Sequence, residues 1–221
     1  MQRAWPYLLP YTALLTCAEL ARWLPAPWEA PMLLLRVALP AALVAVALGR
    51  GAFSELRSGA PGWPVDVGFG LAIAALWLGP YLLLPGLPRG EPFDPEALGD
   101  GARPAWLALR LAGFVLVSPL VEELFVRSFL HRVVECWPDW ERFDELAVAH
   151  YHRLAFLVTV GWFTLSHSPW EWWVAMPTAA LLNGWLYWRG RLGNVWIAHA
   201  SANAAIGALV VWGPLDLWSF L

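Results

Sequence analysis

Residues 118–132 read SPLVEELFVRSFLHR, an apolar stretch that contains two adjacent glutamates, Glu122 and Glu123, with Arg127 four residues beyond the second. An ionisable residue at membrane depth is energetically unfavourable and is by default a candidate for function. Helical positions four apart share a face, so Glu123 and Arg127 can pair, whereas Glu122 points about 100° away. The stretch therefore predicts one neutralised and one free carboxylate. The alternative is that both glutamates pair with arginines and only hold helices together.

The composition is typical of an integral membrane protein. The chain has 221 residues, of which 59% are hydrophobic and 14% charged, and its mean hydropathy is +0.53. Its 17 tryptophans fit a chain with two membrane interfaces. A net charge of -3 is too small to indicate a nucleic-acid partner. Cys17 and Cys136 have no spacing that suggests a disulfide framework or a cysteine metal site.

The hydropathy pattern predicts an all-α, polytopic membrane helix bundle of seven transmembrane helices, or eight if residues 167–171 mark a further break. A spanning helix needs roughly 20 apolar residues, and the stretches that qualify are 5–24, 31–49, 65–85, 105–134, 154–170, 171–188 and 194–213. Pro119 predicts a kink just before the glutamates. We expect one membrane domain over residues 1–221, with motif-free helices in 1–103 and a catalytic core in 104–207.

Arginine placement predicts the orientation, because positive residues concentrate on the cytoplasmic side. One side of the seven-helix arrangement carries Arg3, Arg50, Arg57, Arg127, Arg132, Arg142, Arg153, Arg189 and Arg191. The other side carries Arg22, Arg89 and Arg103, while Arg36 and Arg110 fall within helices. We therefore expect a bacterial inner-membrane protein with a cytoplasmic N-terminus. The acidic loop 85–104 would lie outside, and residues 136–153 would form an interfacial helix on the cytoplasmic surface.

Two further motifs combine a histidine with a residue four positions away. Phe163 and His167 stand late in the fifth predicted helix, and His199 and Asn203 stand early in the seventh, in the sequence IAHASANA. A single membrane histidine often only bonds a neighbouring helix. The small residues around His199 allow close approach of helices, which would bring His199 and Asn203 toward their neighbours. A free carboxylate, two histidines and an amide in apolar helices together favour a catalytic site.

The ordered motifs EExxxR, FxxxH and HxxxN resemble those of the CPBP family of intramembrane proteases, which includes the type II CAAX prenyl endopeptidases and the Abi proteins. The resemblance covers about residues 104–207. It implies an endopeptidase in which Glu122, helped by His167, activates water, and in which His199 and Asn203 stabilise the oxyanion. Glu123, Arg127 and Phe163 would be supporting residues. Ser128 departs from the glycine that many members have after the arginine.

Two alternatives remain open from the sequence. Glu122, His167 and His199 could instead hold zinc with an open position for water. The sequence favours no cofactor, because such a zinc site would still need a separate base. A non-catalytic immunity factor or binder, with structural charges, is the second alternative. The expected partners are the lipid bilayer and a membrane-anchored protein or peptide substrate, with a CAAX motif or a C-terminal sorting tail. The depths of the three motifs predict a cavity open toward the cytoplasm.

Overall fold

The computed structural model describes residues 1–221 apart from 1–2, 26–27, 58, 85, 93–98 and 214–215. Its α-helices are α1 (Trp5–Ala21), α2 (Glu29–Gly49), α3 (Trp63–Leu83), α4 (Gly99–Ala112), α5 (Ser118–Glu122), α6 (His131–Glu135), α7 (Arg153–Leu165), α8 (Trp172–Arg189) and α9 (Leu192–Trp212). Two π-helical segments, η4 (Gly113–Val117) and η5 (Glu123–Leu130), adjoin α5. The described residues contain no strand, which confirms the all-α fold class.

Among the described residues, four helices are long and apolar enough to cross a membrane. They are Ala30–Gly49, Trp63–Leu83, Gly101–Glu135 and Leu192–Trp212. Two of the other predicted spans are shorter, since α1 has 17 residues and α7 has 13. α7 ends at Leu165, and Ser168 takes an extended conformation before Pro169, as residues that precede proline commonly do. The total of seven spans therefore stays a prediction.

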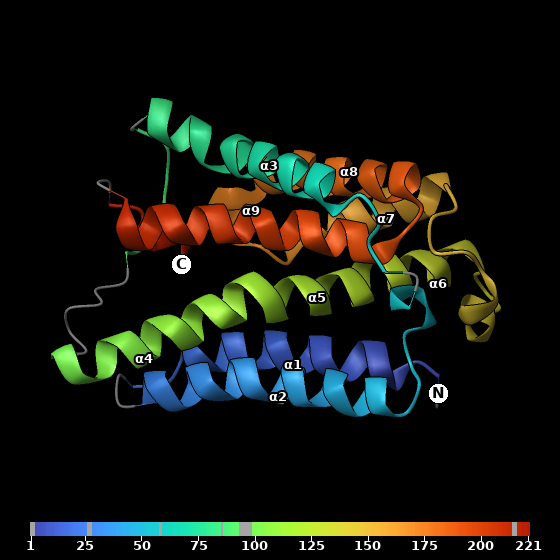
Figure 1. The fold of residues 1–221 in the computed structure, drawn as a ribbon, viewed down its shortest axis with the longest axis horizontal. Helices are drawn as coiled ribbons and strands as arrows, with labels where there is room; N and C mark the ends of the chain where they lie inside the picture. Colours follow the sequence, from blue (N-terminus) through green and yellow to red (C-terminus); the bar gives the residue numbers. More distant parts are fainter. Residues whose placement is uncertain (1–2, 26–27, 58, 85, 93–98, 214–215) are drawn as a thin grey trace.

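One long helix separates two groups of helices (Figure 1). α4, η4, α5, η5 and α6 follow one another without a break and cross the middle of the molecule. α1 and α2 pack together on one side of this long helix, and α3 and α9 pack together on the other. α7 and α8 form a third pair, which lies behind α9 in the view of Figure 1. The long helix thus has different helices packed on its two sides.

The long helix changes geometry twice near the glutamates. The π segment η4 ends at Val117, directly before Ser118 and Pro119, where the sequence predicts a kink. A second π segment starts at Glu123, so Glu122 is the last residue of α5. π turns inside α-helices are often found at functional sites, because the extra residue in the turn redirects side chains. The geometry around both carboxylates is therefore not that of a regular α-helix.

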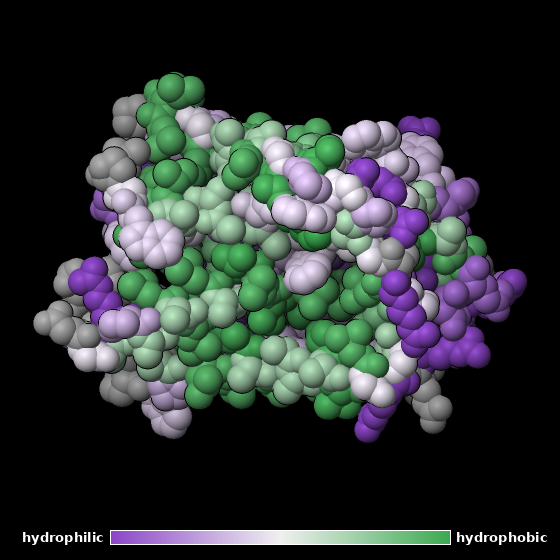
Figure 2. Space-filling model, viewed as in Figure 1, coloured by the Kyte–Doolittle hydropathy of each residue, from purple (hydrophilic) through white to green (hydrophobic). Residues whose placement is uncertain are grey.

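Polar side chains concentrate at the end of the molecule that carries the N-terminus, and apolar ones cover its middle (Figure 2). The prediction that Arg127 belongs to this polar end is wrong. Arg127 is fully buried and paired with Glu123, because the long helix continues for two more turns before it ends at Glu135. The acidic loop is also shorter than predicted, since Asp100 and Arg103 lie in α4. Asp94 and Glu96 fall outside the described residues.

The predicted interfacial helix at residues 136–153 does not form. Pro138 cannot continue a helix, and only a 3-10 segment, η6 (Trp140–Glu145), follows it. Phe143 anchors this segment, because its side chain is 1% exposed and its ring lies 5.6 Å from that of Tyr7 and 5.0 Å from that of Phe129. The segment is therefore a folded cap on the polar end of the bundle.

Gly70 allows the close packing of α3 against α9. A Cβ atom at this position would lie 2.3 Å from the backbone oxygen of Ala198. We expect Gly70→Val to force α3 and α9 apart and to lower the free energy of unfolding by about 1–3 kcal/mol, as overpacked sites do. Thermal unfolding of the purified protein in detergent measures this. Gly68→Val is the matched control, because a Cβ there meets nothing within 4 Å. Equal stability of the two variants would contradict the close contact.

Candidate active site

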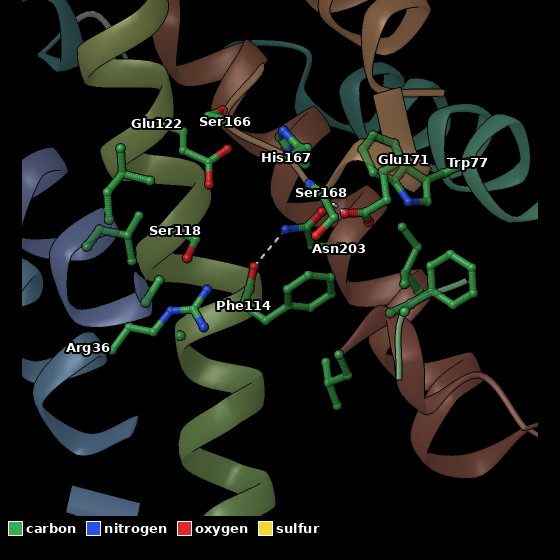
Figure 3. Close-up of a pocket in the computed structure, with 18 of the residues that line it drawn as sticks. Arg36, Trp77, Phe114, Ser118, Glu122, Ser166, His167, Ser168, Glu171 and Asn203 are labelled. Atoms are coloured by element: carbon green, nitrogen blue, oxygen red, sulfur yellow. Dashed lines mark hydrogen bonds between the residues drawn. The ribbon is translucent and has the colours of Figure 1, made fainter. Parts of the chain in front are cut away.

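A cavity of about 950 Å³ lies between the two groups of helices. Five residues singled out in the sequence line it: Glu122, Phe163, His167, His199 and Asn203. Glu122 comes from α5, His167 from the turn after α7, and His199 and Asn203 from α9. Figure 3 shows Glu122 and His167 facing each other across the cavity, with Asn203 nearby. The three sequence motifs therefore meet in space, although their first and last residues are 81 positions apart.

Glu123 and Arg127 form an ion pair behind the cavity wall, as their spacing predicts. Arg127 Nη1 donates to Glu123 Oε1 at 2.9 Å, and both side chains are fully buried. Arg127 Nε also donates to Asn183 Oδ1 on α8, and Asn183 in turn donates to Thr159 Oγ1 on α7. The guanidinium carbon of Arg127 lies 4.7 Å from the centre of the Phe163 ring. This pair therefore fixes the long helix against α7 and α8.

His199 lies between the two glutamates. Its Nδ1 is 2.7 Å from Glu123 Oε1, and its Nε2 is 4.0 Å from Glu122 Oε2. The carboxylate that is paired with Arg127 can only accept, so Nδ1 carries a hydrogen and donates to it. Nε2 is then the atom that faces the cavity and Glu122. It can donate a hydrogen bond to a bound group when the imidazole is protonated.

Glu122 is held much less tightly than Glu123. Its side chain is 19% exposed and lines the cavity. Within the described part of the chain, the 4.0 Å contact with His199 is the only ion pair it makes, and no hydrogen bond to its carboxylate is found. One carboxylate is thus neutralised and buried, and the neighbouring one is free to act on a bound molecule. This division is the one that the EExxxR spacing predicts.

The ring of His167 has a fixed tautomer. Its Nδ1 is 2.7 Å from the carbonyl oxygen of Phe163, and because a carbonyl only accepts, Nδ1 carries the hydrogen. Nε2 therefore presents a lone pair. The rings of Phe163 and Trp77 lie 4.4 and 5.4 Å from the imidazole and hold its position. His167 can accept a hydrogen bond from a water molecule in the cavity, opposite Glu122 (Figure 3).

Asn203 faces the cavity with part of its hydrogen-bonding capacity in use. Its Nδ2 donates to the carbonyl oxygen of Phe114, in η4, at 2.7 Å. A π segment leaves backbone carbonyls with altered partners, so this bond ties α9 to the segment. The amide nitrogen has two hydrogens. The second can donate to a group in the cavity.

The residues named for a zinc site are not grouped as ligands. Among the residues that the structure describes, no three His, Cys, Asp or Glu side chains are placed so that they could hold a metal ion. His199 directs Nδ1 at Glu123, and Nδ1 of His167 is bonded to Phe163, which leaves one nitrogen of each ring. Hydrolysis without a metal therefore stays a prediction that chelation can test.

The cavity reaches the end of the bundle opposite the N-terminus. Its outer part is lined by Glu19 and Arg22 at the end of α1, by Glu91, and by the C-terminal residues 218–221. The prediction that it opens toward the arginine-rich end is therefore wrong. The Glu123 and Arg127 network and the packed rings around Phe143 fill the bundle on that side. Helix depths alone could not reveal which end of the bundle is filled.

Arg36, Arg110 and Glu171 also line the cavity, and none of them was predicted as a site residue from the sequence. Arg36 is in α2, Arg110 is in α4, and Glu171 ends the 3-10 segment η7 (Pro169–Glu171). The signal for the two arginines was present, because a lone charge inside an apolar helix is itself a candidate for function. The orientation argument placed both within helices and assigned them no role. Glu171 follows a proline in what was expected to be a simple break between helices.

Comparison with known families identifies the core of the chain. Residues 104–205 match a family model described as "Type II CAAX prenyl endopeptidase Rce1-like". The match supports the CPBP and CAAX protease family over the segment that carries the three motifs, which confirms the resemblance predicted from them. No curated protein and no solved structure matches the chain.

Arg127→Gln tests whether the buried pair holds the bundle together. The substitution leaves Glu123 buried with an uncompensated charge, so we expect the free energy of unfolding to fall by about 3–5 kcal/mol. Thermal unfolding in detergent measures the loss. Arg142→Gln is the control, because Arg142 bonds Glu145 on the exposed surface at the same type of short spacing and should leave the unfolding temperature unchanged. Equal behaviour of the two variants would show that the buried pair is not essential to the fold.

Proposed function

Because residues 104–205 resemble the type II CAAX prenyl endopeptidases, we propose that this integral membrane protein is an intramembrane endopeptidase. It hydrolyses a peptide bond of a membrane-associated protein or peptide. The observation that carries the proposal is the different environment of the two adjacent glutamates. Glu123 is neutralised by Arg127, while the carboxylate of Glu122 is free in a cavity and faces His167.

In this proposal Glu122 is the general base. A water molecule bound between Glu122 and His167 Nε2 loses a proton to Glu122, and the resulting hydroxide forms a bond to the carbonyl carbon of the scissile peptide. A carboxylate that lines the cavity and, within the described residues, has both oxygens free of hydrogen bonds suits this task, because it can accept a proton from a water molecule within reach. The tetrahedral intermediate then breaks its C–N bond, and Glu122 returns the proton to the leaving amine. The products are one carboxylic acid and one amine.

His199 and Asn203 are placed to stabilise the oxyanion of the intermediate. Protonated His199 can donate from Nε2, and Asn203 can donate its second amide hydrogen. Fixed donors aimed at developing charge in a site away from water are commonly the largest contribution to catalysis. The bond from His199 to Glu123 and that from Asn203 to Phe114 hold both donors in place before the substrate binds.

The opening of the cavity suggests where substrates come from. The concentration of arginines at the end that carries the N-terminus predicts that this end lies in the cytoplasm. The cavity would then open toward the other side of the membrane. Substrates would then be presented from that side. A C-terminal sorting tail of an exported protein, or an exported peptide, fits this access better than a cytoplasmic CAAX protein.

A non-catalytic role is the second candidate, and one observation favours it. The buried network of Glu123, Arg127, Asn183 and His199 joins three helical elements, η5, α8 and α9, and would stabilise the fold without any catalysis. Glu122 distinguishes the two candidates, because its only contact with that network among the described residues is the 4.0 Å approach of His199 Nε2. A binder or immunity factor would tolerate its replacement.

Glu122→Ala tests the catalytic proposal. We expect purified wild-type protein to cleave members of a library of membrane-anchored peptides, and we expect Glu122→Ala to reduce cleavage at least about 10³-fold, since it removes the base. Peptide products are measured by mass spectrometry. The variant should unfold at the wild-type temperature. Glu141→Gln, at an exposed site on η6, is the matched carboxylate control and should retain full activity.

A zinc chelator added to the same assay separates the two mechanisms. Activity that persists with chelator but is absent in Glu122→Ala supports hydrolysis without a metal. Activity lost in both samples indicates zinc. Full activity of Glu122→Ala, with or without chelator, contradicts the role of Glu122 as the base and indicates that another residue acts as the base.

Cysteine labelling in intact cells tests the orientation. In a Cys136→Ser background, Glu91→Cys places a thiol at the cavity mouth, and Arg142→Cys places one at the opposite end of the bundle. A membrane-impermeant thiol reagent should label Glu91→Cys in intact cells and Arg142→Cys only after lysis. The reverse pattern would place the cavity mouth in the cytoplasm. Cys17 does not interfere, because its side chain is buried.

A further inference from the structure

Two arginines line the cavity beyond the proposed catalytic residues. Arg36 lies in α2 and Arg110 in α4, both within helices of apolar sequence. Within the described part of the chain, neither side chain has a hydrogen bond or an ion pair. The Nε atom of Arg110 is buried and has no hydrogen-bond partner. Each guanidinium thus brings a positive charge to the cavity without a bonded counter-charge.

Three other arginines inside this bundle each form an ion pair with a carboxylate. Arg127 is paired with Glu123, Arg132 with Glu55, and Arg189 with Asp66, at distances of 2.9, 3.2 and 2.9 Å. A buried charge without a partner is strongly unfavourable, and charged residues within a membrane normally face a partner or a cavity that serves function. Arg36 feels the charge of the Glu122 carboxylate but makes no bond to it. The contrast indicates that a bound molecule supplies the bonded partner that Arg36 and Arg110 lack.

A close helix crossing brings the two arginines to the same place. A Cβ atom at Gly113 would lie 2.5 Å from Cγ2 of Val37, so α2 and the long helix nearly touch there. Arg36 is next to Val37, and Arg110 is one turn before Gly113. Arg110 also lies within the electrostatic field of Arg36. Two positive charges on the helices that meet at this crossing favour an anion between them.

The crossing lies within the reach of a short peptide from the catalytic centre. Figure 3 shows Arg36 pointing into the cavity near Ser118, one helical turn before Glu122 on the same wall. Arg110 precedes Glu122 by 12 positions, which is about 18 Å at a rise of about 1.5 Å per residue. An extended peptide spans that distance in roughly five residues. An anionic group of the substrate near the scissile bond could therefore reach both arginines.

We propose that Arg36 and Arg110 form a substrate-carboxylate subsite, which binds a carboxylate of the peptide within about five residues of the bond that is cut. The planar fork of a guanidinium suits a carboxylate, which it can hold with two parallel hydrogen bonds. The carboxylate would be either the C-terminus of the peptide or an aspartate or glutamate side chain. This proposal rests on the proposed endopeptidase function and adds to it a preference for anionic substrates.

Matched peptides test the subsite. A cleaved peptide is compared with its C-terminal amide and with versions in which each nearby aspartate or glutamate is replaced by asparagine or glutamine. We expect one of these neutral versions to show a KM at least tenfold higher with wild-type protein, while kcat changes little. The version that responds identifies which carboxylate is bound. Equal KM values for all charged and neutral versions would overturn the proposal.

Arginine variants link the preference to these two residues. The double variant Arg36→Gln and Arg110→Gln should bind the charged peptide as weakly as wild type binds the neutral one, and it should no longer distinguish the two peptides. Arg36→Lys should retain part of the preference. Arg22→Gln is the control, because Arg22 lies at the exposed mouth of the cavity and contacts Glu19. An undiminished preference in the double variant would overturn the assignment even if the peptides differ.

Two further arms separate this proposal from others. Binding of labelled peptides to Glu122→Ala, measured by fluorescence anisotropy, needs no catalysis. If binding depends on peptide charge but the wild-type protein cleaves no peptide, the subsite is supported and the proposed endopeptidase function is contradicted. If the wild-type protein cleaves charged and neutral peptides equally well, the endopeptidase function is supported and the subsite is contradicted. The assays are repeated in nanodiscs of phosphatidylcholine with and without phosphatidylglycerol. If the arginine variants respond to the anionic lipid and not to peptide charge, the arginines bind lipid phosphate and the proposal is overturned.

Discussion

The buried ion pair of Glu123 and Arg127 is the interaction on which the rest of the structure depends. The two opposite charges neutralise each other inside the bundle. Arg127 also donates to Asn183 of α8, which in turn donates to Thr159 of α7, and Glu123 accepts from His199 of α9. Breaking such a pair leaves an uncompensated buried charge. Because Arg127 pairs with Glu123, the neighbouring Glu122 has only the 4.0 Å contact with His199 as an ion pair within the described residues. The same pair thus fixes the bundle and leaves the carboxylate that we propose as the base facing the cavity.

The cavity exists because the long helix does not close the space between the groups of helices on its two sides. Glu122 lies between the two π segments of this helix, and the carbonyl oxygen of Phe114 in the first segment accepts a hydrogen bond from Asn203 of α9. Close approach occurs instead at glycines: α3 meets α9 at Gly70, and α2 meets the long helix at Gly113. These contacts set the walls, while aromatic rings and the buried network fill the end that carries the N-terminus. The cavity therefore reaches the opposite end, where Glu19, Arg22 and Glu91 line it.

Charge is distributed unevenly along this cavity. Glu122 supplies negative charge at the catalytic end, and Arg36 and Arg110 supply positive charge at the crossing of α2 with the long helix. A peptide with a carboxylate on one side of the scissile bond would be oriented by these groups before reaction. Such positioning lowers the entropy lost in the transition state. The N-terminal helices, which carry no recognisable motif, would in this way contribute to the choice of substrate.

The sequence by itself determined the helical class, the membrane setting, the pairing of Glu123 with Arg127 and the family resemblance, because each depends on local spacing or on composition. It could not determine which end of the bundle is open, that Arg127 is buried rather than at the polar end, or that residues 136–153 fold as a cap without an α-helix. It also did not show that His199 lies between both glutamates, or that Arg36 and Arg110 share a cavity with them. These features depend on how distant helices cross. Periodicity specifies the face that a residue occupies on its own helix, whereas only tertiary packing decides what that face meets.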